Sequence, residues 1–187
     1  ATPAVAIQRS QDIAARMAED SAQAMRLAMG LIRKFDRKSL DRVLELENNT
    51  DRYEDALGTY LVQLSSRSLS VADSRILNTL LYTISDVERI ADHAVNVGKA
   101  ALEMEEKKIV FSQQAQGELE VLERAVSDIL GRTVEAYRSF DRELARKVEP
   151  QEQVVDALVR EIKSRHIRRL RDGRCSVEYG FVLEDLL

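Results

Sequence analysis

The chain has 187 residues and a formal net charge of −4. Its 7 glycines and 2 prolines are too few for the tight turns of an all-β or Rossmann-type fold. Hydrophobic residues make up 44% and charged residues 32%, which is too apolar for a disordered chain and typical of long amphipathic helices. The composition therefore predicts an all-α protein, and the acidic balance argues against a surface devoted to nucleic acid.

Cysteine usage and hydropathy restrict the class of protein further. The single Cys175 excludes an internal disulfide and a cysteine zinc cluster, so a reducing compartment fits best. The longest stretch without a charged residue, 56–66, is shorter than the roughly 18 residues that a spanning helix needs. The chain starts at Ala1 without methionine or a signal segment. We therefore expect a chain that is soluble as it stands and is a fragment of a longer protein.

Apolar residues recur at helical spacing along the whole chain. Pro3 after Thr2 marks the start of the first helix. In chain order, the expected helices cover residues 3–34, 39–66, 70–106, 112–139 and 141–170, with a sixth beginning near Ser176 after a turn over 171–174. Short connections between long helices predict antiparallel bundles.

The second half of the chain repeats the first. Phe35-Asp36-Arg37 returns as Phe140-Asp141-Arg142, an offset of 105, and Leu80-Leu81 returns as Leu186-Leu187, an offset of 106. The sequence therefore predicts two tandem three-helix units, residues 1–108 and 109–187, with the second truncated in its last helix. The truncation leaves apolar surface uncovered and favours self-association, for example into a homodimer.

Carboxylates interrupt the apolar stripes of the second and third helices. Glu47, Thr50, Asp51 and Glu54 occupy the stripe in one helix, and Glu88, Asp92 and Asn96 follow one another at four-residue spacing in the other. Like charges at this spacing repel, and charge beside apolar surface needs a partner.

The interpretation that supplies such a partner is a metal site with hard oxygen ligands. In it, residues of the second helix face residues of the third. The proposed ligands are Glu47, Asp51, Glu88, Asp92 and Asn96. Glu152 and Asp156 repeat Glu47 and Asp51, but their facing residues would fall beyond Leu187, so a second site there is expected to be weak, empty or completed by another chain. The alternative is a solvated acidic face.

Other reactive residues form no recognisable catalytic set. Neither His93 nor His166 belongs to a Glu-x-x-His pair, which argues against a ferritin-like di-iron centre. We expect His93 at the edge of the site or in water, His166 exposed, and Cys175 as a partly buried structural thiol. The basic run 160–174 is interpreted as helix C-terminal cations that offset the macrodipole, with phosphate binding as the alternative. The sequence shows no catalytic machinery, so we expect no enzyme activity.

The repeats and their acidic motifs resemble the PhoU family over nearly the whole chain. The motifs are Glu47-x-x-x-Asp51, Glu88-Arg-Ile-Ala-Asp92-His-Ala-Val-Asn96 and Glu152-x-x-x-Asp156. Within that family the chain is most similar to the PhoU-like cytosolic tail of bacterial sodium/phosphate cotransporters. Thr2-Pro3 and the run from His166 to Ser176, leading to Gly180–Leu187, carry this finer likeness.

The resemblance implies a PhoU-like, metal-binding regulatory domain of phosphate transport rather than an enzyme. The implied cofactors are metal ions, iron or zinc, in multinuclear clusters held by the acidic motifs. The implied partner is the transmembrane transporter domain of the parent chain, at the cytoplasmic side of the cell membrane. The alternatives are a stand-alone PhoU-type regulator of phosphate uptake and signalling, and a metal-free helical scaffold or dimerisation module; nucleic-acid binding is a distant third.

Overall fold

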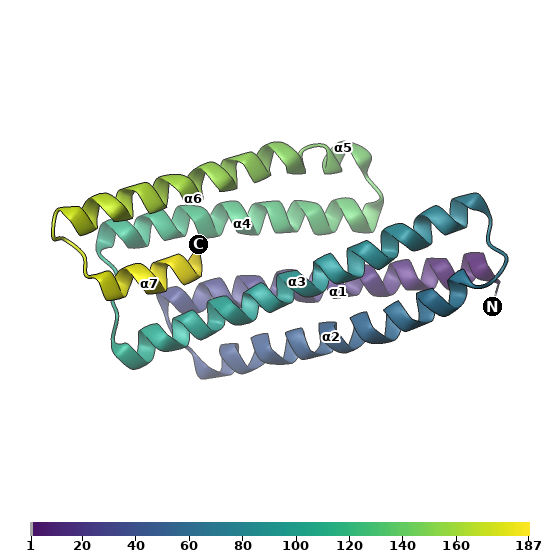
Figure 1. Ribbon diagram of the computed structural model, residues 1–187, viewed down its shortest axis with the longest axis horizontal. Helices are drawn as coiled ribbons and strands as arrows, with labels where there is room; N and C mark the ends of the chain where they lie inside the picture. The colour runs from purple at the N-terminus through teal and green to yellow at the C-terminus, as the bar shows by residue number, and fades with distance from the viewer. Residues whose placement is uncertain (1) are drawn as a thin grey trace.

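The computed structural model describes residues 2–187, and all regular structure in that range is helical. The helices are α1 (Pro3–Arg33), α2 (Arg37–Ser65), α3 (Val71–Lys107), α4 (Gln113–Ser139), α5 (Arg142–Ala145), α6 (Val148–Arg171) and α7 (Val177–Leu186). Figure 1 shows α1, α2 and α3 as one antiparallel bundle, with α4 and α6 lying alongside it and the short α7 running back between the two groups. The all-α expectation is confirmed.

Side-chain caps fix where most helices begin, because they satisfy backbone N–H groups that have no partner inside the helix. The cap residues, each accepting from the N–H three residues ahead, are Asp36, Ser70, Ser112, Asp141 and Ser176. Asp36 and Asp141 are equivalent in the repeat, as are Ser70 and Ser176. Part of the repeated sequence is therefore a repeated capping signal.

The first bundle packs around the small side chains of α1. This helix contacts α2, α3 and α4, and half of its buried residues are alanines, such as Ala14 and Ala24. Small side chains let neighbouring helices approach closely, while leucines from α2 and α3 fill the remaining space. Ser21 adds a buried hydrogen bond of 2.9 Å to the backbone oxygen of Val87, which fixes α1 against α3.

The second group of helices has a smaller core. Its apolar cluster joins α4, α6 and α7 to the end of α3, with Leu122, Ile162 and Leu183 among its buried residues. Helix α7 packs on α3 of the first bundle as well as on α6. The predicted boundary at residues 108 and 109 lies in the connection between α3 and α4.

The expectation of one continuous helix over 141–170 is wrong. The structure has the single-turn α5, a break at Arg146 and Lys147, and then α6. Pro150 explains the break: in a continuous helix its ring would clash with the carbonyl of Arg146 and no N–H would bond that oxygen. When α6 starts at Val148, Pro150 falls in the first turn, where an N–H is not required.

Leu61 tests the packing of the first bundle. It is 0% exposed in the core, so Leu61→Ala should lower the free energy of unfolding by about 2–5 kcal/mol. Its neighbour Val62 is 59% exposed, and Val62→Ala should change that energy by less than about 0.5 kcal/mol. Urea unfolding followed by far-ultraviolet circular dichroism measures both. Equal losses in the two variants would contradict the orientation of α2.

Candidate functional site

Acidic side chains from α2 and α3 gather along the solvent edge of the seam between these helices. Glu47 and Glu88 are half-buried, whereas Asp51 and Asp92 are exposed. The expectation that carboxylates stand in core positions is therefore too strong. Leu46 and Thr50 on α2, with Val87 and Ala91 on α3, keep the buried side of the seam intact. The hydroxyl of Thr50 is satisfied locally by donating to the backbone oxygen of Leu46 at 2.9 Å.

The carboxylates of the two helices act on each other electrostatically. Burial raises the pKa of Glu47, and the negative charges of Asp92 and Asp51 raise it further, while Lys99 partly opposes them. Because Asp92 belongs to α3 and Asp51 to α2, Glu47 experiences charge from both sides of the seam.

Glu88 experiences the same repulsion from the α3 side. Burial raises its pKa, followed by the charge of Asp92, a hydrogen bond with that side chain, and the charges of Asp51 and Glu54. We call Glu47, Asp51, Glu88 and Asp92 the carboxylate cluster. In the salt bridges of the described chain, none of these four carboxylates is paired with a lysine or arginine.

The donor chemistry of the carboxylate cluster fits a divalent metal ion. Several carboxylate oxygens repel one another without a compensating cation, and a metal ion supplies the charge that would relieve this repulsion. Within residues 2–187, no three acidic, histidine or cysteine side chains already stand in a metal-binding arrangement.

The other predicted ligands are placed differently. Asn96 is exposed one turn after Asp92 on α3 and also lines a groove that faces the second group of helices, together with the exposed His93. Glu152 and Asp156 are exposed on α6, which contacts α4, α5 and α7. The structure thus brings together four of the seven predicted ligands and keeps the pair on α6 in a different part of the fold.

Two residues near the cluster were missed in the sequence analysis. Ser85 donates a hydrogen bond of 2.9 Å to Glu54, which links α3 to α2 beside the cluster. Lys99, two turns after Asp92 on α3, carries a positive charge that lowers the pKa of Glu47. A usable signal existed, because Ser85 lies one helical turn before Glu88 and Lys99 lies seven residues after Asp92, near the same face.

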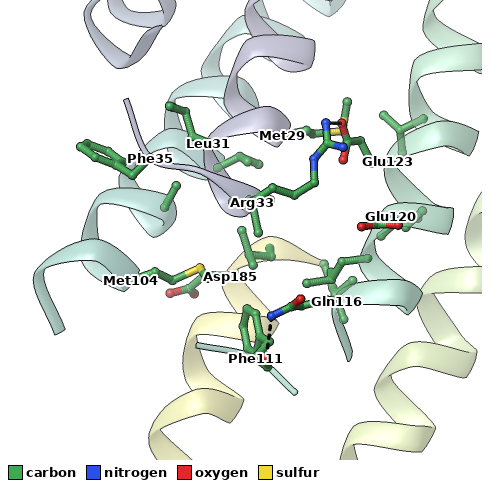
Figure 2. A pocket seen from close by; sticks show the side chains of 18 of the residues that line it. Met29, Leu31, Arg33, Phe35, Met104, Phe111, Gln116, Glu120, Glu123 and Asp185 are labelled. Carbon is green, nitrogen blue, oxygen red and sulfur yellow. Dashed lines mark hydrogen bonds and ion pairs between the residues drawn. The ribbon is translucent and has the colours of Figure 1, made fainter. Parts of the chain in front are cut away.

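A groove of about 650 Å³ separates the two groups of helices near the end of α7. Figure 2 shows its lining, with Met29 and Arg33 from α1, Met104 from α3 and Asp185 from α7. Arg33 reaches across to Glu123 of α4 in an ion pair of 3.0 Å. The groove lies beside the end of α7, and most of its lining is apolar. Self-association through it stays a prediction.

The basic run on α6 is largely neutralised within the chain. Arg169 forms a buried bidentate pair with Glu118, at 3.0 and 2.9 Å. Arg165 and Arg168 pair with Glu161. Basic residues also occupy the last turn of α6, as the interpretation of helix C-terminal cations requires. The internal pairing favours that interpretation over a phosphate-binding patch.

The expectation that His166 is exposed is wrong. Its side chain is buried between α6 and α7, and the residue is only 8% exposed. The packing of α7 covers this side of α6, which the charge of the surrounding sequence did not indicate. Cys175 is partly exposed at the turn before α7, as predicted. In the part of the chain that the structure describes, no helix has the length and apolar character needed to span a membrane.

Comparisons with known proteins agree with this architecture. A model of the PhoU domain matches residues 14–101 and 119–185. The phosphate-specific transport system accessory protein PhoU homolog of Xylella fastidiosa strain 9a5c is 25% identical over 142 residues, which are 76% of this chain and 59% of that protein. PhoU homolog 1 of the same system in Thermotoga maritima is 26% identical over 149 residues, 75% of this chain and 60% of that protein.

The fold is also found in a solved structure. The crystal structure of PhoU from Pseudomonas aeruginosa superposes with a TM-score of 0.73 at 19% identity, covering 98% of this chain and 83% of that chain. At this identity the likeness shows a shared fold. The chain spans about three-fifths of the length of the two curated relatives described above.

The pKa shifts in the cluster predict a pH dependence of stability. A carboxyl whose pKa is raised by folding binds more protons in the folded chain, so stability falls as pH rises above about 4.5, the ordinary value for glutamate. In chelator-treated buffer at neutral pH, Glu88→Gln should raise the free energy of unfolding by roughly 0.5 kcal/mol, a small effect because solvent screens the charges. Urea unfolding across the acidic range measures it.

Glu106→Gln is the matched control for this pH experiment. Glu106 lies on the same helix, is exposed and is far along the chain from the carboxylate cluster. Its substitution should leave the pH profile unchanged. If Glu88→Gln destabilised the metal-free chain at neutral pH, the repulsion inferred for the cluster would be wrong.

Proposed function

This chain belongs to the PhoU domain family, and from that premise we propose that it regulates phosphate uptake as an accessory protein of a phosphate transport system. The observation that carries the proposal is the match of the PhoU model across both groups of helices. Two relatives that share about three-quarters of the chain are named as accessory proteins of phosphate-specific transport systems. The proposed partner is accordingly a transporter in the membrane, met by this chain at its cytoplasmic side.

The relatives favour the stand-alone regulator over the cotransporter tail that the sequence motifs suggested. Their names describe accessory proteins rather than transporters. An antibody against this chain distinguishes the two forms in the organism that produces it. Recovery at the mass of an accessory protein supports the stand-alone form, whereas recovery only as part of a membrane-embedded chain supports the tail.

We propose that the carboxylate cluster holds the metal that the family resemblance implies. Glu47 and Asp51 would bind it from α2, and Glu88 and Asp92 from α3. The metal would supply positive charge that joins two helices whose carboxylates otherwise repel. Binding would stiffen the α2–α3 seam, so the bundle could present a defined surface to its transporter. In this proposal the domain acts by binding and not by catalysis.

Metal content tests the cluster directly. After chelation and reloading with Zn²⁺ or Fe²⁺, Glu88→Gln and Asp92→Asn should retain much less metal than the wild type, as measured by inductively coupled plasma mass spectrometry. Glu106→Gln is the control and should bind normally. Metal should stabilise the wild type by roughly 2.7 kcal/mol at a concentration a hundredfold above its Kd, because it binds the folded chain only. Changes at Glu152 or Asp156 should cost less metal than changes at the cluster.

A metal-free scaffold would give a different result in the same measurements. Wild type and cluster variants would then match in metal content and in melting temperature, with and without chelator. That outcome would remove the metal from the proposal while leaving phosphate regulation to be tested separately.

Phosphate uptake tests the regulatory role. Deleting the gene in its own organism should change the rate of radiolabelled phosphate uptake, and restoring the wild-type chain should reverse the change. Asp92→Asn should restore control less fully than Glu106→Gln, because only the former alters the carboxylate cluster. Uptake of sulfate, an unrelated anion, serves as the control and should not change. Unaltered phosphate uptake after deletion would contradict the proposed function.

A further inference from the structure

A buried imidazole forms part of the contact between α6 and α7. His166 of α6 is only 8% exposed, because α7 packs on this side of α6. The position that a Cβ would take on Gly180 of α7 lies 2.9 Å from Nε2 of His166. This separation is too short for a Cβ atom, so the absence of a side chain at Gly180 lets the backbone of α7 approach the ring closely.

The two ring nitrogens of His166 have different surroundings. Nδ1 lies 3.8 Å from the sulfur of Cys175, whose own hydrogen is donated to the backbone oxygen of Ser176. The sulfur can therefore accept from Nδ1. Nε2 is buried, and within residues 2–187 no group forms a hydrogen bond with it. Because Nε2 faces the Cα of Gly180, its lone pair meets a C–H group, which the neutral ring tolerates.

Protonation of this ring would place a second N–H group against α7. The charged imidazole carries a hydrogen on both nitrogens, so Nε2 becomes a donor. In the closed structure that donor points at a C–H group of Gly180 and not at an acceptor. A buried charged donor without an acceptor is unfavourable, and separation of α7 from α6 relieves the cost by letting water reach Nε2.

The acidic groups nearest to His166 already have cationic partners. Glu118 of α4 forms the bidentate pair with Arg169, and Glu184 of α7 pairs with Lys163 of α6. Burial lowers the pKa of His166, the charge of Arg169 lowers it further, and Glu184 and Glu118 oppose this effect more weakly. The balance of charge therefore favours the neutral ring while α7 is in place.

The cavity beside the ring, of about 540 Å³, provides no further acid. Among the residues that line it, Arg169 and Arg174 carry positive charge, and none is acidic. The other titratable side chains of the lining, Cys175 and Tyr179, are of types that carry no negative charge in mildly acidic solution. A positive charge on His166 thus finds no compensating group on this side either.

Helix α7 is also one wall of the groove between the two groups of helices. Asp185 and Leu186, at its end, line that groove together with Leu187, and Figure 2 shows Asp185 beside Met104 of α3. The helix has only 10 residues. An element this short can open locally while the longer helices stay folded.

We propose that His166 makes the attachment of α7 sensitive to pH, so that mild acid releases α7 from α6 and widens the groove beside its end. The neutral ring accepts the close approach of Gly180, and the protonated ring does not. This device is separate from the carboxylate cluster and does not depend on the regulatory role proposed above. The stabilising effect of the neutral ring is complete above about pH 6.5, the ordinary pKa of histidine, and is lost as the pH falls below that value.

Hydrogen exchange measured by mass spectrometry reports how often α7 opens. Rates are first corrected for the intrinsic pH dependence of amide exchange. Between about pH 7.5 and about pH 5.5, protection of the α7 amides should fall by up to about tenfold, because the open form takes up a proton with the ordinary pKa of histidine. Protection of α2 should not fall over the same range. Constant protection of α7 in the wild type would overturn the proposal.

Substitution of each histidine in turn identifies the group that titrates. His166→Gln has no ionisable ring at this position, so its α7 should be equally protected at both pH values. His93→Gln is the matched control, because His93 is an exposed histidine on α3, and it should keep the wild-type fall. An equal fall in His166→Gln and the wild type would assign the effect to another group and overturn the proposal.

A titration of the wild-type ring decides the matter if His166→Gln does not hold α7 closed at neutral pH. Two imidazole signals are expected in the nuclear magnetic resonance spectrum, since the chain has 2 histidines, and His93→Gln removes one of them. The remaining signal belongs to His166. It should titrate with a midpoint below about 6.5, over the range in which α7 loses protection. A midpoint at or above the ordinary value would overturn the proposal.

Discussion

Close packing of α1 against three other helices positions nearly everything else in the structure. Half of its buried residues are alanines and two more are serines, and these small side chains bring α2 and α3 near enough to share one core and leave another side for α4. A larger side chain at Ala14 or Ala24, both fully buried, would push these helices apart. The carboxylates of α2 and α3 meet at the solvent edge of the seam because the buried residues on its other side pack the two helices together.

The carboxylate cluster shows that a well-packed core can tolerate repulsion between charges at its surface. Loss of hydration and repulsion between carboxylates raise the pKa values of Glu47 and Glu88 and cost some free energy of folding. This cost is small compared with the free energy gained by burying residues such as Leu46 and Ile84 in the same helices. The bundle therefore tolerates an edge whose charges are suited to a cation, and an ion that binds there would gain from relief of the repulsion.

Local signals predicted the helices well, and tertiary contacts explain where prediction failed. The capping residues Asp36 and Ser70 and their repeats are local, so helix starts could be read from the sequence. Pro150 was also a local signal, but the helical spacing of apolar residues alone, without Pro150, was used to predict this helix. The burial of His166 had no local signal, because it depends on α7 folding back over α6. Spacing placed Glu88, Asp92 and Asn96 on one face of α3, whereas it could not show that Asn96 also lines the groove.

Helix α7 belongs to the second unit by sequence but packs against α3 of the first. Lys107 at the end of α3 lies 3.6 Å from Glu178, and Tyr179 meets Phe111 edge to face, with ring centroids 6.3 Å apart. Together with the packing of α1 against α4, this contact joins the two units at two places. Because the two units share these contacts, we expect them to unfold together in one cooperative transition. A ligand that binds the folded chain at either end of the molecule would then change the stability of the whole chain.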